Sequence, residues 1–190
     1  RLCFDDRLEM RPVFNNRAGL PAVYNRQISE ENRDKVLLFM HEDLWLDDCF
    51  ICERLHEALE AFDLVGVAGS LTRAPGQASW DAGGAEGLSG SFGRGNAGGE
   101  VCHFGPSGKP CALLDGAFLA VRCRMLLERD LRFDERFAYH HYDLDFCRSA
   151  AEKQLKIGTW PISVTRGGTD DRRAPAWQAG VQQYLGKWTA

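Results

Sequence analysis

A histidine and two acidic residues, His41, Glu42 and Asp43, directly follow the short apolar run 36–40. Such a run, bounded by charges, predicts a buried strand, and open α/β sheets bind ligands at the carboxyl ends of their strands. Asp43 with His41 or Glu42 suits a divalent cation that bridges two phosphates, because carboxylates prefer Mg²⁺ or Mn²⁺ and imidazole tolerates Mn²⁺. The same residues would also serve as a solvated strand end and helix cap.

Asp143 and Asp145 open a predicted late helix. At about 100° per residue they fall on opposite flanks of its buried stripe, so we expect them to do different jobs. Asp143, favoured by the dipole at the helix N-terminus, is either a cap or a general base that takes a proton from a hydroxyl. The dipole lowers the pKa of such a base, so burial or a nearby negative charge has to oppose it. The expected stripe consists of Leu144, Cys147, Ala151 and Leu155.

Strand, helix and strand patterns follow one another between residues 36 and 68, which predicts a βαβ unit and a parallel sheet. The run 36–40 is expected to be a central strand buried on both faces, and 64–68 the second strand. The helix between them shows one apolar face with helical spacing. That face consists of Ile51, Leu55, Ala58, Leu59 and Phe62.

Two apolar segments, 112–114 and 117–121, flank Asp115 and Gly116, which predicts two strand segments with a turn or bend between them. The segment 83–99 contains eight glycines and is predicted to be a flexible, irregular loop, because glycine offers the backbone few anchors. The other expected elements are a helix within 17–32, a short helix at 125–127, a strand around Ile162 and Val164, and a closing helix from Trp177 to Trp188.

The composition fits one ordinary globular domain of 190 residues. A net charge of −4 argues against a nucleic-acid partner. No apolar run approaches the roughly 20 residues of a transmembrane helix. The seven cysteines lack the spacing of a zinc site and predict free thiols in a reducing compartment, hence a cytoplasmic protein. The oligomeric state is not indicated.

Four segments resemble, in the same order, motifs of the family-2-like glycosyltransferases. N-N-R-A-G-L-P-A-V-Y-N resembles the helix before their metal-binding strand, and D-K-V-L-L-F-M-H-E-D-L-W-L resembles that strand with its D-x-D or H-x-D motif. L-L-D-G-A-F-L-A-V-R resembles their acceptor-side strand, and F-D-E-R-F-A-Y-H-H-Y-D-L-D-F-C-R-S-A their late helix with a Glu-Asp pair. Together the segments span about residues 14–165, most of the chain.

This resemblance implies a GT-A fold, which is a Rossmann-like α/β fold with a mostly parallel sheet flanked by helices, in a single domain over 1–190. It implies transfer of a sugar from a nucleotide-sugar donor, with a UDP-sugar as the expected donor, to a hydroxyl of a carbohydrate or other acceptor. The family reacts with inversion and uses a divalent metal, Mn²⁺ or Mg²⁺. Asp43 would be the main metal ligand and His41 the second, while Asp143 would be the catalytic base.

The substrate-binding residues are expected to be Asp115 and Gly116, together with Trp80 and Arg166. Arg166 marks a departure from the family, because it lies in S-V-T-R-G-G where many members have a metal-binding histidine. A cation at this position could replace metal charge beside a diphosphate, or it could mean that metal binding is weak or lost. Two further departures are His41, where many members have aspartate, and Tyr142, where the pair usually has glutamate.

The family's first strand, which helps to bind the nucleotide base, is not recognisable before residue 14, and the chain begins with Arg1. Either this part of the domain lies outside this sequence, so that an N-terminal part is missing, or the domain is degenerate. Two other functions stay open: a non-catalytic GT-A-like domain that binds sugar or nucleotide, and a Mg²⁺-dependent nucleotidyltransferase. Bound UDP would favour the transferase, a nucleoside triphosphate the nucleotidyltransferase, and neither metal nor nucleotide the binding domain.

Overall fold

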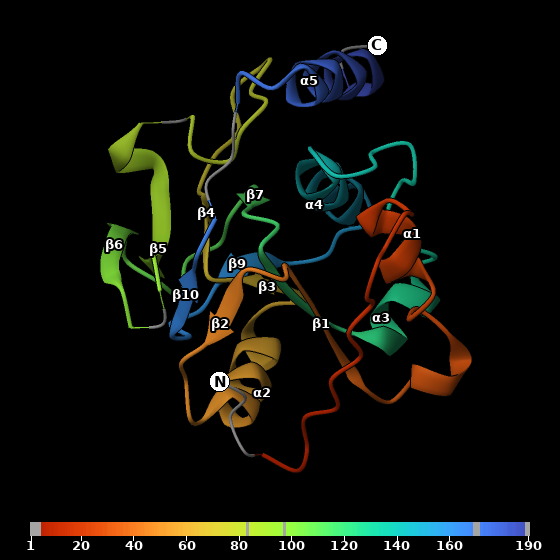
Figure 1. Cartoon of the computed structure of the whole chain (residues 1–190), viewed down its shortest axis with the longest axis vertical. Helices are drawn as coiled ribbons and strands as arrows, with labels where there is room; N and C mark the ends of the chain where they lie inside the picture. Colours follow the sequence, from red (N-terminus) through yellow and green to blue (C-terminus); the bar gives the residue numbers. More distant parts are fainter. Residues whose placement is uncertain (1–4, 83, 97, 169–171, 189–190) are drawn as a thin grey trace.

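The computed structural model describes residues 5–82, 84–96, 98–168 and 172–188 (Figure 1). The helices of this part of the chain are α1 (Leu20–Asn25), α2 (Ile51–Ala61), α3 (Cys123–Glu128), α4 (Tyr142–Glu152) and α5 (Pro175–Trp188), with 3-10 turns η1 (Glu30–Asn32) and η2 (Ala85–Gly87). The strands are β1 (Val36–Met40), β2 (Leu44–Leu46), β3 (Leu64–Gly66), β4 (Ala68–Ser70), β5 (Leu88–Arg94), β6 (Glu100–Gly105), β7 (Leu113–Leu114), β8 (Phe118–Arg122), β9 (Ile157–Thr159) and β10 (Val164–Arg166). None of the described helices combines the length and the apolar character that a membrane crossing requires.

The strands form two sheets. The four-stranded sheet has the order β1-β8-β3-β9, and the six-stranded sheet has the order β2-β10-β5-β4-β7, with β6 paired to β5. The chain passes from one sheet to the other five times. The passage from β2 to β3 contains α2, and the other four are short links at 41–43, 67, 115–117 and 160–163. These links are the positions where the backbone leaves one ladder before it enters the other.

The expectation of a mostly parallel, Rossmann-like GT-A sheet is wrong. Among the described strand pairs only β3–β9 and β5–β10 are parallel, and the other six pairs are antiparallel. β1 and β3, the two strands of the expected βαβ unit, do run in the same direction, but β8 lies between them and is antiparallel to both. The short link at 115–117 leads the chain into β8. The local pattern around residues 36–68 cannot indicate that a strand so distant in the sequence is inserted between β1 and β3.

Strand β8 is far more buried than β1. Residues 118–121 of β8 are each 0 % exposed, whereas β1 is the edge strand of its sheet and Val36 is 39 % exposed. The expectation that 36–40 is a central strand buried on both faces is therefore wrong. Both runs are short and apolar, and hydrophobicity alone does not distinguish an edge position from a central one.

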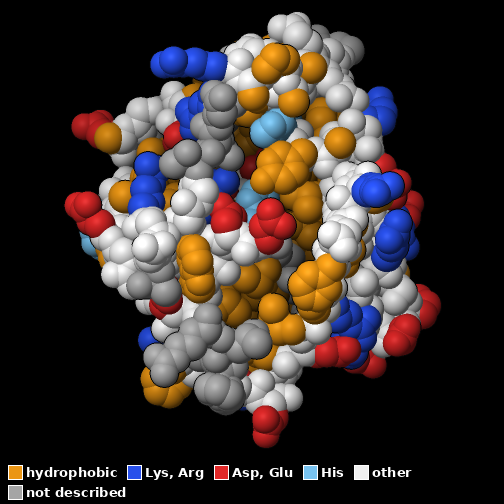
Figure 2. All heavy atoms as spheres, in the orientation of Figure 1, with side chains coloured by type: hydrophobic (Ala, Val, Ile, Leu, Met, Phe, Trp, Pro, Cys, Tyr) orange, Lys and Arg blue, Asp and Glu red, His pale blue; other side chains and the backbone are white. Residues whose placement is uncertain are grey.

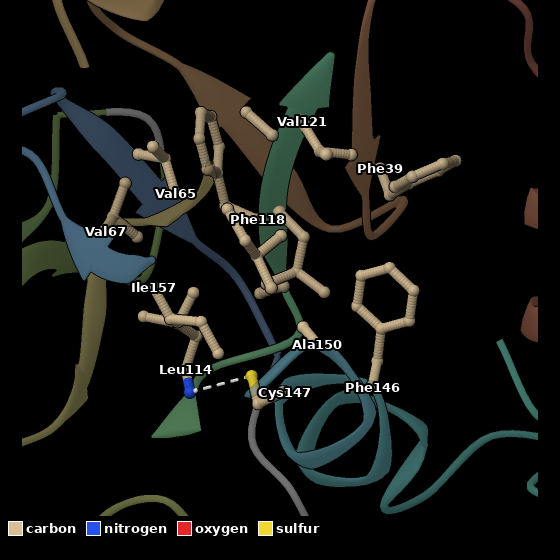
Figure 3. Close-up of a cluster of buried hydrophobic side chains, with 14 of the residues drawn as sticks. Phe39, Val65, Val67, Leu114, Phe118, Val121, Phe146, Cys147, Ala150 and Ile157 are labelled. Carbon is tan, nitrogen blue, oxygen red and sulfur yellow. Dashed lines mark hydrogen bonds between the residues drawn. The ribbon is translucent and has the colours of Figure 1, made fainter. Parts of the chain in front are cut away.

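Helices cover the sheets from two sides. Figure 1 shows α2 on one side of the strands and α4 with α5 on the opposite side. The expected buried face of α2 is confirmed at all five positions. Figure 3 shows Phe146, Cys147 and Ala150 of α4 directed toward the strands, where Cys147 Sγ accepts a hydrogen bond of 3.3 Å from the backbone N–H of Leu114. Ala151, expected in this stripe, is exposed, and Ala150 takes its place.

The glycine-rich segment forms mainly an antiparallel hairpin. Residues 88–94 are strand β5, paired with β6, so an irregular loop over 83–99 was the wrong expectation for this stretch; positions 83 and 97 lie outside the described residues. At least one glycine serves close approach of the backbone: a Cβ on Gly90, whose φ is 97°, would lie 1.9 Å from the carbonyl oxygen of Val67. Only glycine fits such a contact, so the composition does not require a loop. The flexibility of the segment stays a prediction.

Gly158 in β9 also allows a close contact, here with the ring of Phe62, and this contact can be tested by its effect on stability. A Cβ at this position would lie 2.4–2.6 Å from three ring atoms of the buried Phe62. We expect Gly158→Ala to lower the free energy of unfolding by about 1–3 kcal/mol, the usual cost of overpacking a core. In urea unfolding, Phe62→Leu should remove part of this cost, so the two changes should be less than additive. Strictly additive changes would contradict the contact.

Candidate functional site

Two of the four short links between the sheets carry candidate site residues, His41 and Asp43 in one and Asp115 and Gly116 in the other. The first turn of α4 lies against them and brings Asp143 to the same cavity. Figure 2 shows histidine, acidic and basic side chains gathered around a hollow on this face. The cavity is lined by His41, Ala78, Ser79, Trp80, Asp115, Gly116, Tyr139, His140, His141, Tyr142, Asp143, Leu144, Arg166, Arg172 and Trp177.

Six of the seven residues proposed from the sequence line this one cavity, and the seventh, Asp43, lies beside it. The Oδ1 atom of Asp43 is 3.9 Å from Nδ1 of His41, and its Oδ2 atom is 3.9 Å from Nε of Arg166. Oδ2 also accepts a hydrogen bond of 2.8 Å from the backbone N–H of Gly168. The Asp43 side chain is 31 % exposed, so it stands at the rim between the cavity and solvent.

Asp143 is a half-buried carboxyl held at the N-terminus of α4. Its Oδ2 atom accepts a hydrogen bond of 2.9 Å from the backbone N–H of Gly116. Burial and the neighbouring Asp115 carboxylate raise the pKa of Asp143 to about 7, although backbone N–H groups of Leu144 and Gly116 oppose this rise. The lowering expected from the helix dipole is thus outweighed. A carboxyl with this pKa exchanges a proton near neutral pH.

Asp145 faces the other way, as the helical spacing predicted. It is 1 % exposed, and its Oδ1 atom lies 2.7 Å from both Nζ of Lys187 and Nε1 of Trp188 on α5. The two aspartates of one helical turn therefore have separate environments. Asp143 meets the cavity, whereas Asp145 ties α4 to α5.

Asp115 and Arg166 form a buried pair below the rim. Nη1 of Arg166 is 3.4 Å from Oδ2 of Asp115, and the Asp115 Oδ1 atom accepts a hydrogen bond of 2.8 Å from the backbone N–H of Ala117. With side chains 11 % and 5 % exposed, both groups are largely removed from water. Arg166 also faces Asp43, so one guanidinium lies between the carboxylates of both links. The cation that the sequence placed near a diphosphate is thus held at the centre of the acidic residues.

Tyr142 joins both links to α4. Its hydroxyl donates a hydrogen bond of 2.8 Å to the carbonyl oxygen of Gly116 and lies 2.8 Å from Nε2 of His41. A tyrosine hydroxyl has a single proton, so with that proton on the Gly116 carbonyl, Nε2 of His41 must be the donor to Tyr142. A neutral His41 then carries its lone pair on Nδ1, the nitrogen nearest to Oδ1 of Asp43.

This donor set fits a divalent cation in part. A lone pair on Nδ1 of His41 and the Asp43 carboxylate are two suitable ligands, and the phosphates of a substrate commonly complete such a site. Within the described ranges there is no group of three or more His, Cys, Asp or Glu side chains that could hold a metal alone. The residues therefore suit an ion that binds together with a phosphorylated ligand.

Aromatic rings form much of the remaining wall. Trp80 is buried and packs edge-on against Phe104 with ring centroids 5.1 Å apart. Tyr139 is 51 % exposed and stacks on His41 at 5.9 Å, while Trp177 of α5 also lines the cavity. Flat rings next to hydroxyl and carboxyl groups suit a ligand with an apolar face and a polar edge.

Sequence reasoning missed Tyr139 and Arg172 and treated Tyr142 only as a departure from a motif. Nη2 of Arg172 contacts both carboxylate oxygens of Asp81, at 2.8 and 2.7 Å, and so joins the segment before α5 to the loop around Trp80. No local pattern could have found this pair, which is 91 positions apart in the sequence. Tyr142 did have a signal, because it adjoins Asp143 at the start of the helix.

The raised pKa of Asp143 predicts a specific pH dependence of stability. The folded protein binds a proton at Asp143 between about pH 4 and 7 that the unfolded chain, with an ordinary pKa of 3.8, has released. Stability from this group therefore falls as the pH rises through that window, by about 1.4 kcal/mol per unit of pKa difference. Asn keeps an acceptor for Gly116 without the charge, so in urea unfolding we expect Asp143→Asn to stabilise the protein at pH 8 and to change little near pH 4.

Asp134 offers a control of opposite sign. Arg136, and after it Lys187, hold the pKa of Asp134 well below its usual range, so its contribution is present at neutral pH and is lost in acid. Asp134→Asn should therefore destabilise the protein at pH 8, and this effect should shrink only as the pH falls below 3.8, where the unfolded chain takes up the proton. An Asp143→Asn effect that does not depend on pH would show that Asp143 titrates normally.

Comparison of the chain with protein-family models and with curated proteins finds no match. The function is therefore inferred from the geometry and chemistry of the site itself.

Proposed function

We propose that this chain is a glycosyltransferase that moves a sugar from a nucleotide-sugar donor, with a UDP-sugar as the first candidate, to an acceptor hydroxyl. One observation carries the proposal: Asp143, a half-buried carboxyl with a pKa raised to about 7, lines a cavity beside carboxylate, imidazole and guanidinium groups. A general base is most effective when its pKa lies near the working pH. The resemblance of four segments to family-2-like glycosyltransferases supports the same reaction.

The proposed reaction is a single displacement. Asp143 in its ionised form takes the proton of the acceptor hydroxyl, and the acceptor oxygen forms a bond to the anomeric carbon of the donor. The bond from that carbon to the diphosphate breaks on the opposite face, so the configuration inverts and the diphosphate leaves with the electron pair. The proton on Asp143 then passes to solvent. In this scheme the Gly116 N–H holds the carboxyl in place, since it bonds Oδ2 of Asp143 at 2.9 Å.

The leaving diphosphate requires positive charge. His41 and Asp43 would hold a divalent ion, Mn²⁺ or Mg²⁺, and such an ion would stabilise the charge on the diphosphate. Arg166 supplies a fixed cation beside the same two links, 3.4 Å from Asp115 and 3.9 Å from Asp43. Because these carboxylates already balance the charge of Arg166, its guanidinium orients a phosphate by hydrogen bonds more than it adds net charge.

The aromatic wall supports a ligand that carries a sugar ring. The buried Trp80 and the half-exposed Tyr139 lie on the same cavity as the carboxyl groups. A pyranose ring has an apolar face that packs on such rings, while its hydroxyls bond to neighbouring polar groups. Asp115 and Gly116, beside Asp143, are then the groups nearest to the sugar or the acceptor.

Donor hydrolysis tests this function without knowledge of the acceptor, because water can take the acceptor's place. The purified chain is incubated with UDP-, GDP- and dTDP-sugars and Mn²⁺, and release of the nucleoside diphosphate is measured. We expect turnover with at least one donor, and a loss of about 10²–10⁴-fold in Asp143→Asn, which lacks the proton acceptor.

Asp145→Asn is the matched control, because it makes the same chemical change on the opposite flank of the same helix. It removes the ion pair with Lys187 and should lower the melting temperature but leave turnover within a few-fold of the wild type. Full activity in Asp143→Asn, or a larger loss of turnover in Asp145→Asn, would exclude Asp143 as the base. If none of the donors releases a nucleoside diphosphate, the proposal itself fails.

The pH profile of the same assay gives an independent prediction. Only the ionised form of Asp143 accepts a proton, and its pKa is raised to about 7 by burial and by Asp115. We therefore expect kcat/KM to rise about tenfold per pH unit below pH 7 and to level off above it. A profile that is already flat between pH 5 and 7 would contradict a base with this pKa.

A further inference from the structure

Tyr142 stands at the meeting point of three elements. It is 2 % exposed in the first turn of α4, and its hydroxyl contacts the link after β1 through His41 and the link after β7 through Gly116. The reaction proposed above assigns it no role. A buried hydroxyl that contacts two different links, with the Tyr24 hydroxyl of α1 beside it, is nevertheless a specific arrangement, because each contact restricts the others.

The Tyr24 hydroxyl also lies beside this hydroxyl and donates to the carbonyl oxygen of Met40 at 3.3 Å. The two contacts with the links indicate where the protons lie. The carbonyl oxygen of Gly116 can only accept, so the hydroxyl proton of Tyr142 lies on that bond, at 2.8 Å. The oxygen of Tyr142 can then only accept from His41, at 2.8 Å, and this requires the hydrogen of the imidazole on Nε2. The stacked ring of Tyr139, 5.9 Å from His41, restricts rotation of the imidazole. The ring orientation and the tautomer are thus set together.

We propose that Tyr142 is a positioning residue that holds His41 in the Nε2–H tautomer, so that Nδ1 offers its lone pair beside Asp43 for a divalent cation. The inference rests on the proposed function, since that function supplies the reason for a cation. It gives a function to Tyr142, which stands where the Glu-Asp pair of the family-2-like glycosyltransferases usually has glutamate. An imidazole in the opposite tautomer would direct an N–H toward Asp43 and could not bind a metal through that nitrogen.

The same hydroxyl connects the cation site to the base. The carbonyl oxygen of Gly116 accepts a hydrogen bond from the Tyr142 hydroxyl, and the N–H of Gly116 donates one to Asp143. A single glycine therefore lies between the two parts of the site. A Cβ at position 116 would lie 2.8 Å from the Tyr142 hydroxyl and 2.6 Å from Cβ of Asp143. Tyr142 thereby keeps the link after β7 at a fixed distance from the link after β1.

The experiment uses nitrogen NMR of the whole chain at pH 8, without metal or nucleotide. In the wild type we expect Nε2 of His41 to show the chemical shift of a protonated ring nitrogen and Nδ1 that of an unprotonated one, with His41→Gln used to assign the signals. Tyr142→Phe removes the acceptor that lies 2.8 Å from Nε2, so we expect a shift from the Nε2–H tautomer toward a mixture of tautomers. A wild type with the hydrogen on Nδ1 overturns the inference, even if the variant does not fold.

Metal affinity is the second readout. Mn²⁺ is titrated into the chain with saturating UDP, and binding is followed by the electron paramagnetic resonance signal of free Mn²⁺. Loss of a hydrogen-bond partner of a metal-ligating histidine typically weakens binding 10–100-fold, so we expect a drop of about that size in Tyr142→Phe. An affinity within twofold of the wild type overturns the inference.

Tyr184→Phe is the matched control. Tyr184 is also fully buried, but its ring lies against His141, with centroids 6.0 Å apart. This change should alter neither the His41 tautomer nor Mn²⁺ affinity, and equal losses in both variants would mean that Tyr142 acts only through general stability. The tautomer is measured without a donor, so it can be confirmed even if donor hydrolysis fails. If donor hydrolysis depends on Asp143 but the His41 tautomer is unchanged in Tyr142→Phe, the role of Tyr142 is refuted and the proposed function is not.

Discussion

The close approach of the first turn of α4 to Gly116 is the constraint on which the site depends. Gly116 donates to Asp143 and accepts from Tyr142, and its lack of a side chain is required because a Cβ would lie 2.6 Å from Cβ of Asp143. Any larger residue would displace the helix from the link. The carboxyl would then lose both its backbone donor and its burial. The position of the Asp143 carboxyl, the orientation of the His41 ring and the link between the two sheets therefore all depend on the contact between Gly116 and α4.

The two-sheet architecture explains why polar residues collect at this position. A backbone that leaves one ladder for the other loses its regular partners, so its polar groups need other ones. At the link of 115–117 the Asp115 carboxylate accepts the N–H of Ala117, and at the link of 41–43 the backbone N–H of His41 bonds the carbonyl of Ala117 at 3.1 Å. The two links therefore bond each other. Side chains that stabilise the passages are the same ones that border the cavity.

The electrostatics of the site follow from where each carboxyl lies in relation to Arg166. Asp115 and Asp43 both face this guanidinium, at 3.4 and 3.9 Å, whereas the neighbours that shift Asp143 are the Asp115 charge and apolar surroundings. Ionisation of Asp143 is therefore the costly step, and its pKa rises. Arg166 thus faces two of the three carboxyl groups, and the third, Asp143, exchanges a proton near neutral pH.

The sequence alone determined several local elements and most of the residues proposed for the site, and the tertiary structure decided how they are arranged. The apolar face of α2, the two strand segments beside Asp115 and the opposite flanks of Asp143 and Asp145 follow from spacing along the chain, which is a local property. The insertion of β8 between β1 and β3 depends on contacts more than 50 positions apart, so the parallel sheet inferred from a βαβ pattern was wrong. The pKa of Asp143 and the tautomer of His41 likewise depend on partners that only the folded chain brings within hydrogen-bond distance.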